Sequence, residues 1–306
     1  MINDAQSAES EPQINAHYDQ LIKRFTTWAE HVPDIRAAIV LGSRARKDAP
    51  ADEWADLDIV IVTTNPEYYL LTSDWIQNMG TPLLTFLEPT ATGGETERRV
   101  LFEGMLDVDF SIISKERVGQ LLKEIPPDVA AQLADTFSRG IRVLVDKDGM
   151  IPQLLSRIPF GKTVSSFPPE KQEFYEVVSD FLYHAVWTAK HLRRGELWWA
   201  KGGCDSHMKW CLLTMVEWHA RAIHGPDYDT WFRGRFLEKW AHPRVVKGLK
   251  DSFAYYNEKD VKRALLVTMD LFRWVAAETA EKLGYPSLDE ADEKVTEWVK
   301  TCLSKI

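Results

Sequence analysis

The sequence predicts an α+β fold, in which an N-terminal half of strands and helices is followed by a C-terminal half of helices. Between residues 35 and 146, short apolar runs bounded by turn residues indicate strands. Beyond residue 170, apolar side chains recur every three or four positions, as in amphipathic helices. A stretch with prolines and a glycine at residues 158–170 separates the two patterns. We therefore expect two domains, residues 1–157 and 158–306.

The N-terminal half is expected to begin with an amphipathic helix over residues 14–31. Residues 98–113 predict a hairpin that turns near Glu103 and Gly104. In its second arm apolar residues alternate with Asp107, Asp109 and Ser111, which predicts one apolar face and one acidic face. The other elements expected here are strands over 35–41, 56–63 and 82–87, a short strand followed by a turn within 141–149, and a helix over 66–79.

The C-terminal half is expected to hold five helices, over residues 171–194, 205–223, 228–240, 258–283 and 287–304. The first carries a polar stripe beside its apolar one, which contains Asp180, His184 and His191, with Lys190 close to its edge. This stripe is either a solvated face or a set of functional groups. In the functional interpretation, Asp180 accepts a proton from an acceptor hydroxyl or orients it.

Composition excludes several classes of protein. A formal net charge of −9 argues against binding to a nucleic-acid backbone and suits a small cationic partner. No apolar run reaches the roughly 18 residues of a membrane span, and the polar start does not resemble a signal peptide. The three cysteines lack the paired spacing of a disulfide framework or a structural zinc site. We expect a cytoplasmic protein.

Residues 41–58, LGSRARKDAPADEWADLD, contain the most informative pattern. Asp56 and Asp58 open an apolar strand, and alternation directs both carboxylates to one side of the sheet. Two anions this close repel each other unless a cation lies between them, and Mg²⁺ prefers such oxygen ligands. Asp107 and Asp109 are candidates for a third carboxylate. The Gly42-Ser43 turn, with Arg44 or Arg46 nearby, has donors for phosphate oxygens.

Alone, an Asp-x-Asp pair is usually a solvated strand end, and a Gly-Ser pair is usually only a turn. In combination they are more specific. Gly42-Ser43, a twelve-residue spacer and Asp56-Leu57-Asp58-Ile59 resemble the nucleotidyltransferase superfamily, whose palm is like that of DNA polymerase β.

A narrower resemblance extends from about residue 20 to residue 290. The stretches AAIVLGSRA, DLDIVIV and LFEGMLDVDFSII are similar to the aminoglycoside 6-adenylyltransferases, which modify streptomycin. In the helical half, DFLYHAVWTAKHLRRGELWWA, LLTMVEWH and LFRWVAAETAEKLGYP are similar to that family in the same order. The chain departs from the family's usual pattern at residues 180–182 and 201–203, in the half that shapes the acceptor pocket.

The resemblance implies a nucleotidyltransferase palm, a mixed β-sheet with flanking helices, followed by an α-helical bundle that binds the acceptor. It assigns metal binding to Asp109 and leaves Asp107 peripheral. The implied site residues are Asp56, Asp58 and Asp109 as metal ligands and catalytic residues, Asp180 as a further catalytic residue, and Gly42, Ser43, Arg44 and Lys190 as nucleotide contacts.

The expected activity is Mg²⁺-dependent transfer of AMP from ATP to a hydroxyl of an aminoglycoside antibiotic such as streptomycin, with release of pyrophosphate. The partners implied are ATP and a cationic aminoglycoside, with neither nucleic acid nor membrane, in a monomer or homodimer that confers antibiotic resistance. Three alternatives remain open: another small-molecule or protein acceptor, a catalytically inactive nucleotide-binding module, and a regulatory or antitoxin-type partner.

Overall fold

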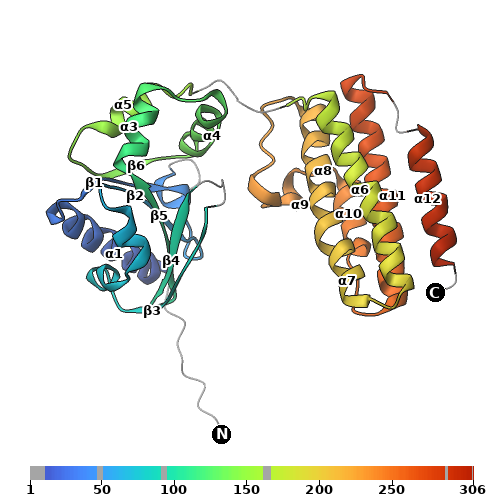
Figure 1. Cartoon of the computed structure of the whole chain (residues 1–306), viewed down its shortest axis with the longest axis horizontal. Helices are drawn as coiled ribbons and strands as arrows, with labels where there is room; N and C mark the ends of the chain where they lie inside the picture. Colours follow the sequence, from blue (N-terminus) through green and yellow to red (C-terminus); the bar gives the residue numbers. More distant parts are fainter. Residues whose placement is uncertain (1–10, 47–50, 91–94, 161–166, 287–288, 305) are drawn as a thin grey trace, which may run out of the picture. The chain divides into compact units, whose positions relative to one another are not determined.

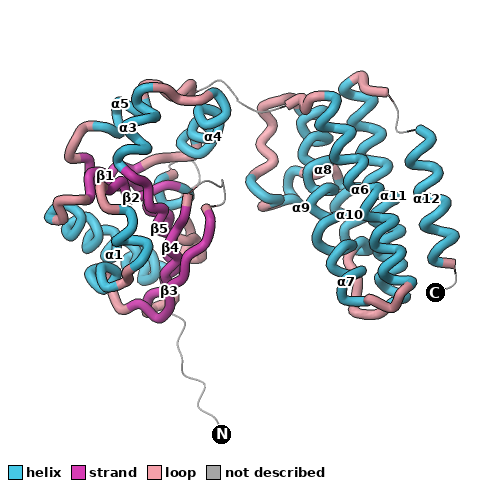
Figure 2. The backbone as a smooth tube through the Cα atoms, in the orientation of Figure 1, coloured by secondary structure: helices cyan, strands magenta, loops and turns pink. Residues whose placement is uncertain are grey.

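The computed structural model describes residues 11–306 except for 47–50, 91–94, 161–166, 287–288 and 305. The chain divides into two compact units, residues 1–164 and 165–306 (Figure 1). The first contains a β-sheet with helices and the second is helical (Figure 2). The α+β class expected from the sequence is confirmed.

The sheet of the first unit has six strands in the order β3-β4-β5-β2-β1-β6. Neighbouring strands are antiparallel except for β2 and β5, which are parallel, so the sheet is mixed. The strands are β1 (Ile35–Leu41), β2 (Leu57–Thr63), β3 (Pro82–Pro89), β4 (Thr96–Phe102), β5 (Leu106–Ser114) and β6 (Arg142–Asp146).

Each face of this sheet packs against its own set of helices. One face buries Leu57 and Phe110 against α1 (Glu11–His31), α2 (Pro66–Leu71) and the 3₁₀ turn η2 (Asp74–Asn78). The other buries Ala37 and Val62 against α3 (Lys115–Lys123), α4 (Pro127–Ser138) and α5 (Met150–Leu155). The alternation expected for the second hairpin arm is observed, since Val108 and Phe110 are buried in the first of these cores.

The second unit consists of helices around a core in which the rings of Phe181 and Phe272 stack at 3.7 Å. No described helix is long and apolar enough to cross a membrane. The helical elements are α6 (Lys171–Arg193), α7 (Leu197–Gly202), the π-helical turn η3 (Gly203–His207), α8 (Met208–His224), the 3₁₀ turn η4 (Phe232–Gly234), α9 (Leu237–Trp240), α10 (Pro243–Ser252), α11 (Glu258–Leu283) and α12 (Asp289–Leu303).

Two expected helices differ from the structure. The helix expected over 66–79 stops at Leu71, because Thr72 is extended, and the chain resumes as the turn η2. The helix expected over 228–240 is wrong for most of its length, because Trp231, Arg233 and Phe236 all have positive φ. Such angles cannot continue a right-handed helix. Helices α3, α4, α5, α7 and α10 were not expected from the sequence.

Candidate active site

Three aspartates gather at one end of the sheet. Asp58 on β2 lies directly beside Asp109 on the parallel strand β5, and Asp56 immediately precedes β2. Each can offer one carboxylate oxygen such that the three oxygens lie within 4.8 Å of one another. Because Leu57 and Ile59 point into the core with α1, Asp58 between them projects from the opposite face.

Further along the strands, that opposite face is covered by helices. Val60 and Val62 of β2, with Ile113 of β5, pack against the core of α3, α4 and α5. The three aspartates, at the beginnings of these strands, remain half-buried. The sheet thus fixes the carboxylates on a rigid scaffold while a ligand can still reach them.

Position 42 requires glycine for two reasons: the close approach of Asp58 and the positive φ of the backbone. Leu41, the last residue of β1, pairs with Asp58, and Gly42 follows with φ +65°. A Cβ atom at Gly42 would lie 2.4 Å from Asp58 Oδ2. A side chain there would therefore displace the carboxylate as well as strain the backbone.

Ser43 lies in the 3₁₀ turn η1 (Gly42–Ala45) directly after β1. Its Oγ is buried and has no hydrogen-bond partner among the described residues. An unsatisfied buried hydroxyl costs about 1–3 kcal/mol, so a ligand or a water molecule that pairs with Ser43 Oγ would be favoured. This orphaned hydroxyl beside three carboxylates fits a metal-bound phosphate group.

Arg44 is half-buried and holds the segment that precedes β2. Its Nε donates to the carbonyl of Asp56 at 3.1 Å and its Nη2 to the carbonyl of Ala55 at 2.6 Å. Its guanidinium carbon also lies 3.5 Å from the centre of the Tyr18 ring. Arg44 therefore fixes the backbone position of Asp56 in this structure.

Asp109 is under electrostatic strain. Burial raises the pKa of its carboxyl to about 6, and the nearby carboxylates of Glu97 and Asp56 add to the effect, while Arg99 opposes it. Arg99 Nη2 lies 3.2 Å from Asp109 Oδ2. A divalent cation among the three carboxylates would relieve this repulsion, so the donor set suits a hard metal ion.

Arg99 is a residue that sequence reasoning missed. It is the cross-strand partner of Asp109, and it also pairs with Glu88 at 2.5 Å and with Glu97 at 3.0 Å. The hairpin register, counted from the Glu103-Gly104 turn, could have indicated this position opposite Asp109. Asp107, by contrast, accepts a hydrogen bond from Tyr18 Oη at 2.7 Å and lies outside the carboxylate cluster.

Asp180 belongs to the helical unit, where it accepts hydrogen bonds from two side chains. His207 Nε2 lies 3.0 Å from both carboxylate oxygens, and Cys211 Sγ lies 3.4 Å from Oδ2. Burial acts to raise the pKa of Asp180, but the bonds from His207 and Cys211 outweigh it, and the pKa is lowered. The lowered pKa favours the ionised carboxylate and makes Asp180 a weaker base.

Lys190 lies on a different side of α6 from Asp180. Its ammonium is 5.7 Å from the centre of the Trp298 ring on α12, and the residue is exposed. Ten residues of helix separate it from Asp180, which is about 15 Å along the axis. The structure therefore does not bring these two predicted site residues together.

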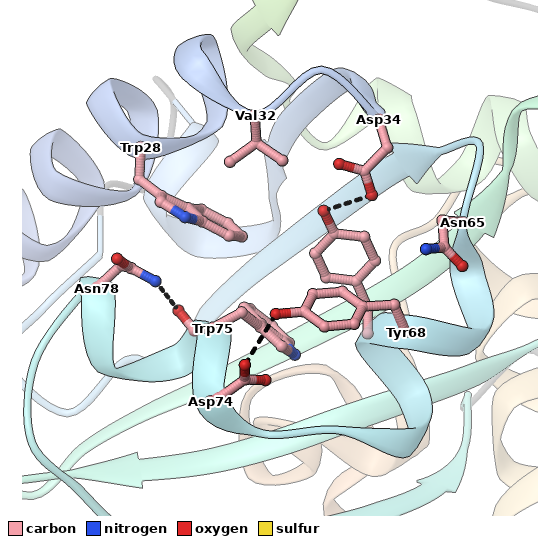
Figure 3. Close-up of a pocket in the computed structure, with 9 residues that line it drawn as sticks. Trp28, Val32, Asp34, Asn65, Tyr68, Asp74, Trp75 and Asn78 are labelled. Atoms are coloured by element: carbon pink, nitrogen blue, oxygen red, sulfur yellow. Dashed lines mark hydrogen bonds between the residues drawn. The ribbon is translucent and has the colours of Figure 1, made fainter.

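A shallow pocket of about 390 Å³ opens on the α1 face of the sheet (Figure 3). Trp28, Asp34 and Tyr68 are among the residues around it, and none of the three clustered aspartates lines it. Asp34 accepts a hydrogen bond from Tyr69 Oη at 2.9 Å, and Asp74 accepts one from Tyr68 Oη at 3.1 Å. Both pocket carboxylates therefore already have donors.

Comparison with known proteins gives consistent matches over nearly the whole chain. A family model described as streptomycin adenylyltransferase matches residues 16–302. The aminoglycoside 6-adenylyltransferase of Bacillus subtilis (strain 168) is 22% identical over 291 residues, which cover 92% of this chain and 96% of that protein. The protein of the same name from Staphylococcus aureus is 21% identical, covering 89% and 94%.

Among solved structures, an aminoglycoside 6-adenyltransferase from Bacillus subtilis matches with a TM-score of 0.43 and 17% identity, covering 94% of this chain and 98% of that one. A nucleotidyltransferase-like protein from Exiguobacterium sibiricum matches with a TM-score of 0.33 and 12% identity, covering 87% and 77%.

Proposed function

Because the chain belongs to the streptomycin adenylyltransferase family, and is by that membership an aminoglycoside nucleotidyltransferase, we propose that it transfers AMP from ATP to a hydroxyl of a streptomycin-like aminoglycoside. Pyrophosphate is the second product. The observation that supports this proposal most strongly is the convergence of Asp56, Asp58 and Asp109 beside the orphaned hydroxyl of Ser43.

The metal in this proposal is Mg²⁺, held by Asp56, Asp58 and Asp109. Nucleotidyltransferases generally use a divalent metal, and an all-carboxylate donor set suits a hard ion. When bound, Mg²⁺ would lower the pKa of the attacking hydroxyl and neutralise charge on the leaving pyrophosphate. Arg99 limits the negative charge at Asp109, and Arg44 holds the backbone of Asp56 in place.

The triphosphate is proposed to lie against the Gly42-Ser43 turn. Gly42 permits the close approach of backbone to ligand, and Ser43 Oγ donates the hydrogen bond for which it has no described partner. Lys190 is proposed as a further triphosphate contact, since a compact cation there would neutralise charge on the leaving group. Arg44 is proposed to support nucleotide binding indirectly, because it holds the backbone of Ala55 and Asp56.

The acceptor is proposed to meet the helical unit at Asp180. The lowered pKa of Asp180 suits it to orient a hydroxyl or bind an ammonium group, whereas Asp109, with its raised pKa, is better suited to take the proton when not fully occupied by metal. The net charge of −9 favours a polycationic drug. The proposed setting is the cytoplasm, and the proposed role is antibiotic resistance.

Pyrophosphate release from ATP by the purified protein, with a panel of aminoglycosides, tests this proposal. We expect turnover with streptomycin, none with kanamycin-type drugs, and no turnover by Asp58→Asn with any drug. ATP binding without turnover of any aminoglycoside would refute the proposed acceptor. It would favour the alternative in which another small molecule or a protein receives the nucleotide.

A further inference from the structure

The pocket on the α1 face of the sheet has the size and the lining of a small-molecule site. Its volume of about 390 Å³ lies within the range of about 300–1,000 Å³ that is typical of ligand pockets. Aromatic rings, carboxylates and side-chain amides surround its opening (Figure 3). We call it the α1 pocket, and its lining includes Trp28, Asp34, Tyr68, Asp74, Trp75 and Asn78.

The aromatic part of the wall is held rigidly. The rings of Trp28 on α1 and Trp75 on η2 stack with their planes 13° apart and their centres 5.8 Å apart. The buried ring of Tyr69 meets both of them edge-on. Trp28 and Tyr68 are only half-buried, so part of their surface is open to a ligand. Ring faces of this kind attract cations, and tryptophan does so most strongly.

Two carboxylates lie on different sides of the opening, and each accepts a hydrogen bond from a tyrosine (Figure 3). Asp34 accepts from Tyr69 Oη at 2.9 Å. Asp74 accepts from Tyr68 Oη at 3.1 Å. A carboxylate has about four acceptor positions, so these hydroxyls orient the two anions without neutralising them. Among the described residues, no lysine or arginine lines the pocket or forms an ion pair with either carboxylate.

Lys147 is a nearby cation whose ammonium is directed elsewhere. Asp34 acts on it electrostatically and raises the pKa of Lys147, although burial lowers that pKa more strongly. Its Nζ donates to the carbonyl of Ala29 at 2.8 Å and to that of Val32 at 2.6 Å. Lys147 therefore reduces the negative charge of Asp34 only from outside the pocket, and it leaves the pocket itself to a cation from solution.

We propose that the α1 pocket binds a small organic dication. Its two ammonium or guanidinium groups pair with Asp34 and Asp74, and its carbon skeleton lies against Trp28. Carboxylates on different sides of an aromatic opening suit two separated cationic groups better than a single one. Asn78 Nδ2 donates to the carbonyl of Trp75 at 2.7 Å, which leaves Asn78 Oδ1 to accept from an ammonium group.

This site is separate from the proposed catalytic site. None of the three clustered aspartates lines the α1 pocket, and Asp58 projects from the other face of the sheet. The proposal therefore does not rest on the proposed function. A free polyamine and an aminosugar both carry the required pair of cationic groups, so the experiment compares one probe of each kind.

Fluorine NMR of the full-length protein labelled with fluorotryptophan tests the proposal, because each tryptophan gives a signal of its own. The Trp28 signal is assigned by its absence from Trp28→Phe. We expect putrescine to shift this signal in a saturable way, and added salt to weaken the binding. Butanediol, which has the same length without the charges, should not shift it. Streptomycin is the second probe, and the cation that acts at the lower concentration identifies the source.

Two variants remove the charges and keep the hydrogen bonds, because asparagine still offers an oxygen to the tyrosine hydroxyl. Asp34→Asn and Asp74→Asn should each weaken putrescine binding by about threefold, and the double variant by about tenfold. Asp135→Asn on α4, whose side chain is 74% exposed, makes the same change in net charge away from the pocket and should bind as the wild type does. Thermal unfolding checks that the variants are folded.

Three results would overturn the proposal. The first is a Trp28 signal that neither cation shifts. The second is an equal shift with butanediol, and the third is undiminished binding by the folded double variant. The first two are measured on the wild-type protein, so they decide the matter even if a variant fails to fold.

Discussion

The two aspartate-centred clusters of this protein differ in how their charge is balanced. In the sheet unit, Asp56, Asp58 and Asp109 lie together, Arg99 pairs with Asp109, and the pKa of Asp109 is still raised to about 6. In the helical unit, Asp180 has two histidines and a thiol around it, and its pKa is lowered. The anionic form of the carboxylate is therefore destabilised at Asp109 in the sheet unit and stabilised at Asp180 in the helical unit.

This difference indicates what each cluster is suited to bind. Three crowded carboxylates gain most from a hard cation, which in the proposed function is the metal that accompanies ATP. The carboxylate of Asp180 is already balanced by hydrogen bonds, so it gains less from a cation. The comparison predicts different consequences of mutation at the two places.

The largest expected effect follows from removal of a central carboxylate. Asp58→Asn should lower the rate of AMP transfer by at least about 10³-fold, because it removes a proposed metal ligand that acts in the transition state. The free energy of unfolding is measured alongside, so that a loss of the fold is distinguished from a loss of catalysis. Pyrophosphate release and thermal unfolding measure the two quantities.

Asp107→Asn is the matched control, since Asp107 bonds to Tyr18 and lies outside the cluster. An equal loss of activity in both variants would contradict the assignment of the third ligand to Asp109.

Gly42→Ala should have the next largest effect. The added Cβ would lie 2.4 Å from Asp58 Oδ2, so we expect about a 10²-fold loss of activity in addition to about 1 kcal/mol of backbone strain. Gly149→Ala is a suitable control, because Gly149 has a similar φ of +63° and a Cβ atom there would meet nothing within 4 Å. Both variants should lose similar stability, and only Gly42→Ala should lose activity.

Arg44→Lys should have a smaller effect, of about tenfold in activity. Lysine keeps the charge but cannot reproduce the paired donors that hold the carbonyls of Ala55 and Asp56. If Arg44 instead bound phosphate as a simple cation, lysine would largely replace it. A steady-state comparison of kcat and KM for ATP distinguishes the two roles, and unchanged kinetics would contradict the positioning role.

The smallest expected effect concerns a buried carboxyl in the helical unit. Burial raises the pKa of Glu217 on α8 to about 7, above its ordinary value of 4.5. The folded state then holds a proton that the unfolded state has lost, so stability falls as pH rises from about 5 to 8, by about 1–2 kcal/mol. Glu217→Gln should remove that slope in thermal unfolding, while Glu281→Gln on the exposed side of α11 should keep it.

Much of the sheet unit could be predicted from the sequence because its signals are local. Strand β1 agrees with its expected bounds, and the alternation around Asp109 placed its neighbours in the core correctly. The family resemblance is also confirmed. The helical interval 228–240 could not be predicted, because positive φ angles at Trp231, Arg233 and Phe236 depend on packing rather than on apolar spacing.

The sites show the same limit. The sequence placed Asp56 and Asp58 on one side of a strand and offered Asp109 as a third carboxylate, but it predicted neither the contact of Gly42 with Asp58 nor the parallel pairing of Asp58 with Asp109. The meeting of Asp180 with His207 was not predicted either, because it depends on a π-helical turn that no residue pattern indicates. Arg99 was not predicted as a site residue, although the register of the hairpin places it on β4 opposite Asp109.

Binding of Mn²⁺ in the presence of ATP, followed by electron paramagnetic resonance, tests the central claim most directly. Mn²⁺ reports on an oxygen-ligand site of the kind proposed for Mg²⁺. We predict that wild-type protein and Asp107→Asn bind Mn²⁺–ATP equally and that Asp109→Asn binds it at least about tenfold more weakly. Undiminished binding by Asp109→Asn would contradict the claim that the three clustered aspartates hold the metal.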